Sequence, residues 1–465
     1  MPQERMDPLR ETANEAQAAS GYAERDVSLS PAVPFGRPMR GLFNFRETYT
    51  PLNHGSYGTY PRAVLETRFQ LLRDFEERPS VYKRFVYPPL LKKARAAVAP
   101  LLGADTDEVV FVENATTGVN TVLRNFHFEE GDVVLCPGTI YPACLKTIQA
   151  LAETMPVEAA PFTLVYPVED DEVVALFEAA ARKLREQGKR IRLAIFDTII
   201  SLPGVRVPWE RLVAKCRELG ILSLVDAAHA IGHINMTHTG EVKPDFLVSN
   251  CHKWLFVPRG CAVLYVPFAS QHHIASSLPT SHGYEQPAVR AGIKTSEYFT
   301  NLFVDVATAD NSPYTCIPSA IRFRQEVCGG EEKIREYCHR LAKEGGDRVA
   351  EMLGTEVLDN KSGSIRRCNF ANVRLPLTFV SGEQSGCGTS GTGDVPVSQA
   401  QAVSDYFYER AANEFDTYFQ IKWYEGALWV RLSAQVYLGI QDFEWAARTL
   451  LELCSRVKKG QWKSA

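Results

Sequence analysis

The sequence lacks a long hydrophobic run. The longest dense apolar stretch in its 465 residues covers positions 261–269, and Pro267 interrupts it. A membrane-spanning helix needs about 20 such residues. The N-terminal segment is also not apolar, because positions 1–20 mix charged and polar side chains, unlike a secretory signal. We therefore expect no membrane association and a cytoplasmic location, or one shared between cytoplasm and nucleus.

The sequence also lacks an excess of basic charge and a metal-binding cysteine pattern. Lys plus Arg number 51 and Asp plus Glu 55, for a net charge of −4, which argues against a nucleic-acid partner. The eleven cysteines form no C-x-x-C pair, so we expect neither a metal site nor a disulfide framework. Cys136, Cys144 and Cys251 lie near the motifs described below, and we interpret them as small buried side chains rather than reactive thiols.

Between residues 61 and 300, short apolar runs alternate with helical segments. This alternation predicts an α/β fold whose mostly parallel sheet is covered on both faces. The expected strands cover residues 109–112, 133–136, 193–196, 221–225, 246–248 and 261–266. The expected helices cover residues 61–78, 89–102, 117–125, 143–153, 173–187 and 209–219.

The pattern changes near residue 300, which predicts a large domain over residues 61–300 and a smaller C-terminal α+β domain over residues 301–465. Residues 1–35 form a polar N-terminal tail, and residues 36–60 join the small domain to the active site. A glycine- and serine-rich insertion covers residues 380–398 and is typical of a flexible segment. In the small domain we expect helices at 303–327, 331–352, 398–414 and 442–457, and strands at 368–375, 418–424 and 428–433.

The most informative segments are ILSLVDAAHAIGHI and DFLVSNCHKW. Asp226 ends an apolar run, and His229 follows it by three residues. Lys253 comes shortly after the next apolar run. Because the carboxyl ends of parallel strands meet at one crevice, the lysine and the aspartate can face the same site. Pyridoxal phosphate needs a lysine amine for its aldehyde and a carboxylate beside its ring nitrogen, so this pair predicts that cofactor.

The cofactor also needs a phosphate site. The apolar run at residues 109–112 is followed by Glu-Asn-Ala-Thr-Thr-Gly, which opens a helix. Free N–H groups and hydroxyls at a helix N-terminus attract an anion. Ordinary capping by Asn114 or Thr116 explains the same residues, but the nearby lysine and aspartate favour phosphate binding.

Together with other segments, these motifs resemble the class V aminotransferase family, which has fold type I of the pyridoxal-phosphate enzymes. The resemblance extends over residues 36–455 and is nearest to the branch with isopenicillin N epimerase and the carbon–sulfur lyases of ergothioneine synthesis. The segments that carry it are LNHGSYG at 52–58, NATT at 114–117, DTIISLPG at 197–204, DAAH at 226–229, HKW at 252–254 and RLSA at 431–434.

The resemblance implies roles for the residues that hold the cofactor. Lys253 would bind the aldehyde and move the substrate's Cα proton, Asp226 would pair with the ring nitrogen, and His229 would support the ring. Tyr141 would lie over the ring and act as a catalytic acid. The other implied cofactor contacts are Ala115, Thr116, Asp197, Ser249, His252 and Thr295.

The resemblance also implies a substrate site and a partner. Arg431 matches the position that clamps the substrate carboxylate, and the remaining implied substrate contacts are Asn53, His54, Tyr57, Tyr82 and Arg84. The chain departs from the family pattern in two places. Thr198 stands where relatives often have histidine, and Lys294 precedes Thr295 where relatives often have glycine. The matching threonine of relatives reaches the neighbouring subunit's phosphate, which implies a homodimer with shared active sites.

Residue chemistry alone leaves the reaction open among an epimerase, an aminotransferase and a lyase. The resemblance implies β-elimination from a cysteine S-oxide, hercynylcysteine sulfoxide, with pyruvate, ammonia and a sulfenic acid that is reduced to ergothioneine. An amino-acid epimerase and a cysteine desulfurase are the alternatives within the family, and Cys387 in the insertion is the candidate desulfurase nucleophile. A non-catalytic binding protein on the same fold is the alternative of another class.

Overall fold

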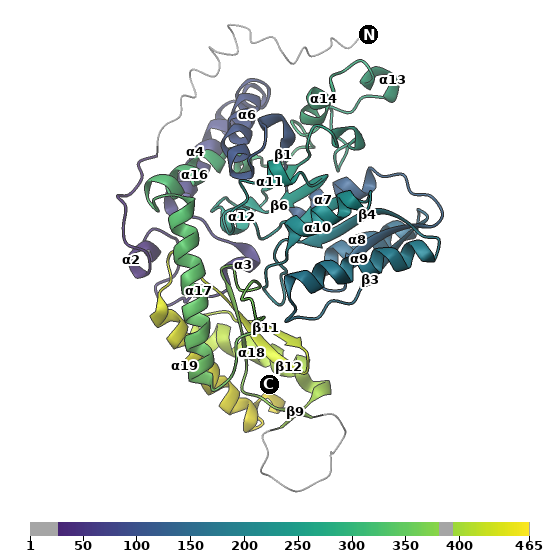
Figure 1. Ribbon diagram of the computed structural model, residues 1–465. Coiled ribbons are helices and arrows are strands. Elements are labelled where there is room, and N and C mark those ends of the chain that lie inside the picture. The colour runs from purple at the N-terminus through teal and green to yellow at the C-terminus, as the bar shows by residue number, and fades with distance from the viewer. Residues whose placement is uncertain (1–26, 381–393, 465) are drawn as a thin grey trace.

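The computed structural model describes residues 27–380 and 394–464 (Figure 1). It shows a large domain around one sheet and a smaller C-terminal domain below it in the figure. Within the described residues, no helix combines the length and apolar character that crossing a bilayer requires.

A seven-stranded sheet forms the centre of the large domain. The strands are β1 (Val109–Val112), β2 (Asp132–Pro137), β3 (Val157–Phe162), β4 (Arg190–Asp197), β5 (Leu222–Asp226), β6 (Phe246–Ser249) and β7 (Ala262–Tyr265). Their order is β1-β7-β6-β5-β4-β2-β3. Strands β2 to β6 pair in parallel, and β7 is antiparallel to both of its neighbours. The mostly parallel sheet expected from the sequence is confirmed. Strand β3 was not expected, because this edge strand is half-exposed and contains few large apolar residues.

Both faces of the sheet are covered, as its uninterrupted apolar strands require. Neighbouring residues of one strand enter different cores: Leu224 of β5 lies in one hydrophobic cluster and Val225 in the other. Helices α7 (Ala115–Arg124) and α8 (Pro142–Ala152) contribute to the first cluster, and α9 (Asp170–Glu186) and α10 (Trp209–Glu218) to the second. The carboxyl ends of β4, β5 and β6 lie at one edge between these layers.

The smaller domain has its own sheet and core. Strands β8 (Phe370–Arg374), β11 (Gln420–Tyr424) and β12 (Ala427–Ser433) pair antiparallel in the order β11-β12-β8. Helix α17 (Glu331–Leu353) packs along α19 (Ile440–Lys458), and α18 (Ala400–Phe415) packs on β11 (Figure 1). These elements share a separate hydrophobic cluster, so the predicted α+β C-terminal domain is confirmed.

The helix expected at residues 303–327 was wrong. The chain forms turns up to residue 311, then α15 (Ser312–Thr315) and α16 (Ile317–Glu326). Pro313 and Pro318 stand in the first turns of these helices, where the backbone N–H groups have no partner within the helix, so a proline costs no hydrogen bond. Inside one long helix, each proline would remove a hydrogen bond. Both helices pack on α4 (Arg62–Glu77) and α6 (Tyr87–Val98), so this part of the expected small domain lies against the large one. The domain boundaries stay a proposal.

The N-terminal segment crosses between the domains. Residues 27–35 form no helix or strand, but Leu29, Val33 and Phe35 pack against the small-domain core. Helices α2 (Arg37–Arg40) and α3 (His54–Tyr57) follow, and α3 packs on α12 (Cys251–Trp254). The rest of the expected tail, residues 1–26, lies outside the described residues.

The remaining elements are short. Strands β9 (Phe379–Val380) and β10 (Val395–Pro396) pair in parallel at the base of the glycine-rich insertion, whose residues 381–393 lie outside the described part. The short helices are α5 (Pro79–Val81), the π-helix η1 (Tyr82–Val86), η2 (Ala99–Leu102), η3 (Thr106–Glu108), α11 (Thr239–Val242), η4 (Gln271–His273), α13 (Pro287–Arg290), α14 (Thr295–Asn301), η5 (Val397–Gln399) and η6 (Gln461–Ser464).

Candidate active site

Two carboxyl groups lie side by side at the carboxyl edge of the sheet. Asp197 ends β4, Asp226 ends β5, and the two residues are partners in the strand register. Burial raises the pKa of both groups, and the proximity of Asp226 raises that of Asp197 further. The Oδ1 atom of Asp226 accepts the Ala228 N–H at 3.0 Å and its Oδ2 accepts the Cys144 thiol at 3.3 Å. The Oδ2 atom of Asp197 has no partner among the described residues. Burial therefore favours the neutral form of both carboxyl groups, and the two hydrogen bonds to Asp226 stabilise its charged form.

The amine of Lys253 lies close to this pair. Lys253 is on α12, which follows β6, and the charges of Asp226 and Asp197 act on its amine. Burial lowers the pKa of Lys253 to about 8. The positive charge of Arg431 also lowers this pKa, whereas Asp226 and Asp197 raise it. About a tenth of the lysine is then in the free-amine form at pH 7. The free amine is the form that attacks an aldehyde.

A hydrogen-bonded chain holds this lysine. The indole N–H of Trp254 donates to Nδ1 of His229 at 3.3 Å, and Nε2 of His229 lies 3.1 Å from Nζ of Lys253. An indole nitrogen is only a donor, so Nδ1 of His229 accepts and the ring's proton is on Nε2. Burial holds the pKa of His229 well below its ordinary value, so the ring is neutral. Nε2 then donates to the lone pair of Lys253, which favours the free amine.

The N-terminus of α7 carries the residues that we expect to bind the phosphate. The Asn114 side chain accepts from the N–H of Thr117, and the Asn250 side chain accepts from the N–H of Ala115 at 2.8 Å. No described residue accepts from the N–H or the hydroxyl of Thr116, so both are available to a phosphate.

The two other expected phosphate contacts behave differently. The Ser249 hydroxyl donates to the Ala227 carbonyl and accepts from the N–H of Ile231, so the backbone uses it. His252 donates from Nδ1 to the Cys261 carbonyl at 2.8 Å, and burial lowers its pKa to about 4. Asn250, rather than Ser249, faces the α7 terminus. Its position next to the lysine motif is the only signal of this role in the sequence.

Arg431 is a buried cation without a buried anion. Its guanidinium donates to the Ser201 carbonyl at 2.5 Å, to Asn53 Oδ1 at 2.9 Å and to Ser56 Oγ at 3.1 Å. Burial lowers its pKa to about 10, and no carboxylate of the described residues pairs with it. Neutral acceptors leave most of a buried positive charge uncompensated. A substrate carboxylate would supply the missing partner through bidentate contact.

Phe370 organises the space around Arg431 and was not found from the sequence. The guanidinium carbon lies 4.4 Å from the centre of its ring, and the rings of His229 and Trp254 each lie 5.4 Å from it. A side chain on Gly204 would meet this ring within 2.7 Å, so the DTIISLPG segment can only approach with glycine here. The signal for Phe370 was weak, since one aromatic residue in a strand is normally core.

The other expected substrate contacts divide into two groups. Asn53 accepts a hydrogen bond from Arg431. The centre of the His54 ring lies 4.8 Å from that of Trp254, and Nδ1 of His54 is hydrogen-bonded to the Tyr437 hydroxyl at 2.8 Å. Tyr57 and Tyr141 are exposed at the mouth of the site. Burial raises the pKa of Tyr141, and so do the nearby Cys144, Asp226 and Tyr57.

Three expected residues are not brought to this site within one chain. Tyr82 is buried with Phe75 at a ring distance of 5.4 Å, between α4 and α6. Arg84 is exposed on η1, and Thr295 is exposed at the start of α14. No described contact joins any of them to Lys253.

The arrangement fits pyridoxal phosphate. Asp226 suits a protonated ring nitrogen, Lys253 suits the aldehyde, and Thr116 at the α7 N-terminus suits the phosphate. A mostly parallel sheet with this site at its carboxyl edge, beside a smaller α+β domain, defines a fold type I pyridoxal-phosphate-dependent enzyme.

Comparisons with known proteins identify the family. The model of the aminotransferase class-V family matches residues 83–375. The L-cysteine desulfhydrase-like protein lolT1 of Epichloe uncinata is 39% identical over 92% of this chain and 98% of its own. The hercynylcysteine sulfoxide lyase of Schizosaccharomyces pombe is 32% identical over 90% and 98%. The chain belongs to the class V aminotransferase family, and its cofactor is pyridoxal phosphate.

A solved structure shows the same fold. The cystine C–S lyase C-DES, solved with its product cysteine persulfide, has a TM-score of 0.68 at 19% identity, over 90% of this chain and 99% of that one.

Proposed function

We propose that the protein is a carbon–sulfur lyase that cleaves hercynylcysteine sulfoxide by β-elimination. The substrate loses its Cα proton, its Cβ–S bond breaks, and the sulfur leaves as a sulfenic acid. The remaining aminoacrylate hydrolyses to pyruvate and ammonia. Two equivalents of an external thiol reduce the sulfenic acid to ergothioneine, and water and a disulfide are formed. The similarity to the fission-yeast lyase over nearly its whole length supports this substrate.

The observation that carries the proposal is the environment of Tyr141. Burial and the nearby negative charge of Asp226 raise the pKa of its phenol, so it keeps its proton at neutral pH. An acid at this place suits the protonation of a leaving sulfur group. The same phenol could return a proton to Cα in an epimerase, so the release of pyruvate separates the two reactions.

The other residues then have defined tasks. When bound, the cofactor withdraws electrons from the substrate's Cα. Arg431 holds the substrate carboxylate, with Asn53 and Ser56 fixing the guanidinium. Lys253, whose free-amine form the hydrogen bond with His229 favours, takes the Cα proton. Tyr141 gives its proton to the sulfoxide oxygen, which departs with the sulfur as the sulfenic acid.

The test is release of pyruvate by the holoenzyme from hercynylcysteine sulfoxide, from its unoxidised thioether and from L-cysteine. We expect the sulfoxide to react far faster than the thioether, because its oxygen shares the departing charge. Tyr141→Phe should slow the reaction by about 10²–10⁴-fold. Tyr284→Phe is the matched control, since Tyr284 is similarly exposed, at 41% against 43%, and stands outside the site.

Other outcomes would assign another reaction. Sulfide and pyruvate from L-cysteine alone would favour a desulfhydrase, the second candidate, which the likeness to lolT1 supports. Solvent deuterium at an inverted Cα without pyruvate would favour an epimerase. A desulfurase needs an accessible nucleophilic cysteine; the cysteines of the described residues are all buried, and Cys387 lies outside them. A chain that binds no cofactor would be a binding protein.

We also propose a cytoplasmic homodimer with shared active sites. The exposed Thr295 and Arg84, which do not reach Lys253 in one chain, support it, because a partner can contribute them. Lys253→Ala and Thr295→Glu chains are each expected to be inactive or weak, and mixing them should restore one intact site per heterodimer. A monomer in sedimentation, or no recovery of activity on mixing, would contradict shared sites.

A further inference from the structure

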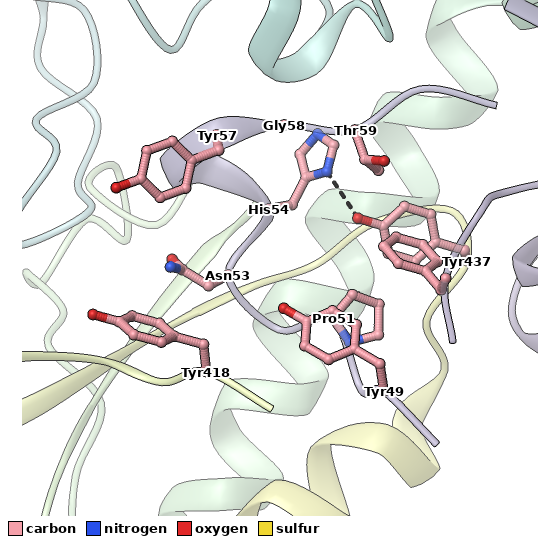
Figure 2. Close-up of a pocket in the computed structure, with 10 residues that line it drawn as sticks. Tyr49, Pro51, Asn53, His54, Tyr57, Gly58, Thr59, Tyr418 and Tyr437 are labelled. Carbon is pink, nitrogen blue, oxygen red and sulfur yellow. Dashed lines mark hydrogen bonds between the residues drawn. The ribbon is translucent and has the colours of Figure 1, made fainter. Parts of the chain in front are cut away.

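A pocket with a volume of about 320 Å³ lies beside the carboxylate site (Figure 2). Five of the residues that line it are aromatic: Phe45, Tyr49, Tyr57, Tyr418 and Tyr437. None of the lining residues is a lysine or an arginine. The one histidine, His54, is neutral, because burial lowers its pKa to about 3. The described wall of the pocket therefore carries no positive charge.

The pocket is continuous with the reacting end of the site. Asn53 lines it and accepts a hydrogen bond from Arg431 at 2.9 Å. Tyr57, at the mouth, lies close enough to raise the pKa of both Tyr141 and Tyr418. Figure 2 shows the polar ends of Tyr57, Asn53 and Tyr418 pointing to the same side. A molecule whose carboxylate is on Arg431 can therefore extend past Tyr57 into the pocket.

Negative charge stands behind one wall. The Thr48 hydroxyl donates to the carboxylate of Asp416, and Asp416 raises the pKa of Tyr49 in addition to the effect of burial. A cation in the pocket would meet aromatic faces with this carboxylate behind them. Both features attract a positive group, and the residues that line the pocket include no lysine or arginine to pair with an anion.

The walls are held in place before any ligand enters. Phe45 packs on the Tyr437 ring at 4.9 Å and on the Tyr49 ring at 6.0 Å. Tyr418 stacks on Tyr408 at 5.1 Å with an interplanar angle of 4°. Fixed aromatic walls suit a rounded group that cannot donate hydrogen bonds, such as a methylated ammonium.

We propose that this pocket is a subsite for a quaternary ammonium group on the leaving half of the substrate. The proposal rests on the proposed function, because hercynylcysteine sulfoxide carries a trimethylammonium on the portion that leaves with sulfur. The carboxylate on Arg431 and the ammonium among the aromatic rings would then hold the two ends, and the C–S bond would lie between them near Tyr141.

The experiment compares the binding of hercynine and histidine to the holoenzyme by calorimetry. The two probes differ only in the three methyl groups on nitrogen, and neither has a C–S bond. The cofactor is first fixed to the enzyme by borohydride reduction, so that the primary amine of histidine cannot exchange onto its aldehyde and the measurement is independent of the reaction. We expect hercynine to bind about tenfold more tightly than histidine, as desolvated cation–π contacts allow. In Tyr49→Leu and Tyr418→Leu, the two affinities should come within about twofold.

Two further variants keep the result interpretable. Tyr57 is 74% exposed, so we expect Tyr57→Leu to leave the fold intact and to reduce the preference for hercynine. Phe268→Leu, an exposed aromatic after β7, should leave the preference intact. Equal binding of both probes by the unaltered enzyme, or a preference that survives all three pocket substitutions, would overturn the subsite. A preference for hercynine without pyruvate release would support the subsite and refute the proposed reaction.

Discussion

Trp254→Phe tests how the chain keeps its catalytic lysine reactive. The substitution keeps the buried aromatic ring and removes the N–H that donates to Nδ1 of His229. Without this donor, the His229 proton can move to Nδ1. Nε2 then becomes an acceptor for the charged amine of Lys253, and the protonated lysine is stabilised.

The size of the effect follows from the lost hydrogen bond. A hydrogen bond between neutral groups contributes about 1 kcal/mol, which corresponds to a change of about 0.7 in a pKa. The pKa of Lys253, lowered to about 8 by burial, should rise by that amount. The free amine at pH 7 would then fall about fivefold. Above pH 10 the unaltered chain and the variant should behave alike, because both lysines are free amines there.

The assay is the rate at which the apoprotein captures pyridoxal phosphate, followed by its visible absorbance from pH 6 to 10. The rate should increase with pH through the lysine's pKa, and the midpoint should be higher in Trp254→Phe. Trp209→Phe is the matched control, because Trp209 is equally buried and its indole N–H has no acceptor among the described residues. An unchanged midpoint in Trp254→Phe, or one moved to lower pH, would refute the hydrogen-bonded chain.

The remaining predictions concern the same site. Lys253→Ala should abolish the visible cofactor band, and borohydride should label Lys253 rather than Lys243 in a peptide map. Arg431→Ala should lower kcat/KM by about 10²–10³-fold, because the substrate carboxylate is left unpaired, and should leave the cofactor band intact. Arg374→Ala, on the exposed end of β8, is the control. Normal kinetics of Arg431→Ala would show that this arginine has a structural role. Gly58→Ala should unfold at a lower temperature or lose cofactor affinity, because its φ is +64° and a Cβ would lie 1.9 Å from the His252 carbonyl oxygen; unchanged melting and affinity would contradict that packing.

The sequence by itself determined the fold class and the centre of the site. Continuous apolar runs alternating with helical periods require a sheet buried on both faces, and Asp226 and Lys253 follow such runs. Because parallel strands end at one edge, their meeting did not depend on details of packing. The same local signals placed nearly every strand of the sheet, and they failed at the half-exposed β3, whose sequence shows no apolar run.

Only the tertiary structure decided which neighbours surround that centre. Phe370 and Arg431 come from strands of the small domain, and Asn53 from the N-terminal segment, so their contacts depend on how distant parts of the chain pack. Ser249 and Asn250 are adjacent in sequence, yet in the strand and the turn after it they face opposite ways: Ser249 toward the backbone, Asn250 toward α7. Sequence spacing predicts which strand end carries a residue, but the direction of each side chain depends on long-range packing.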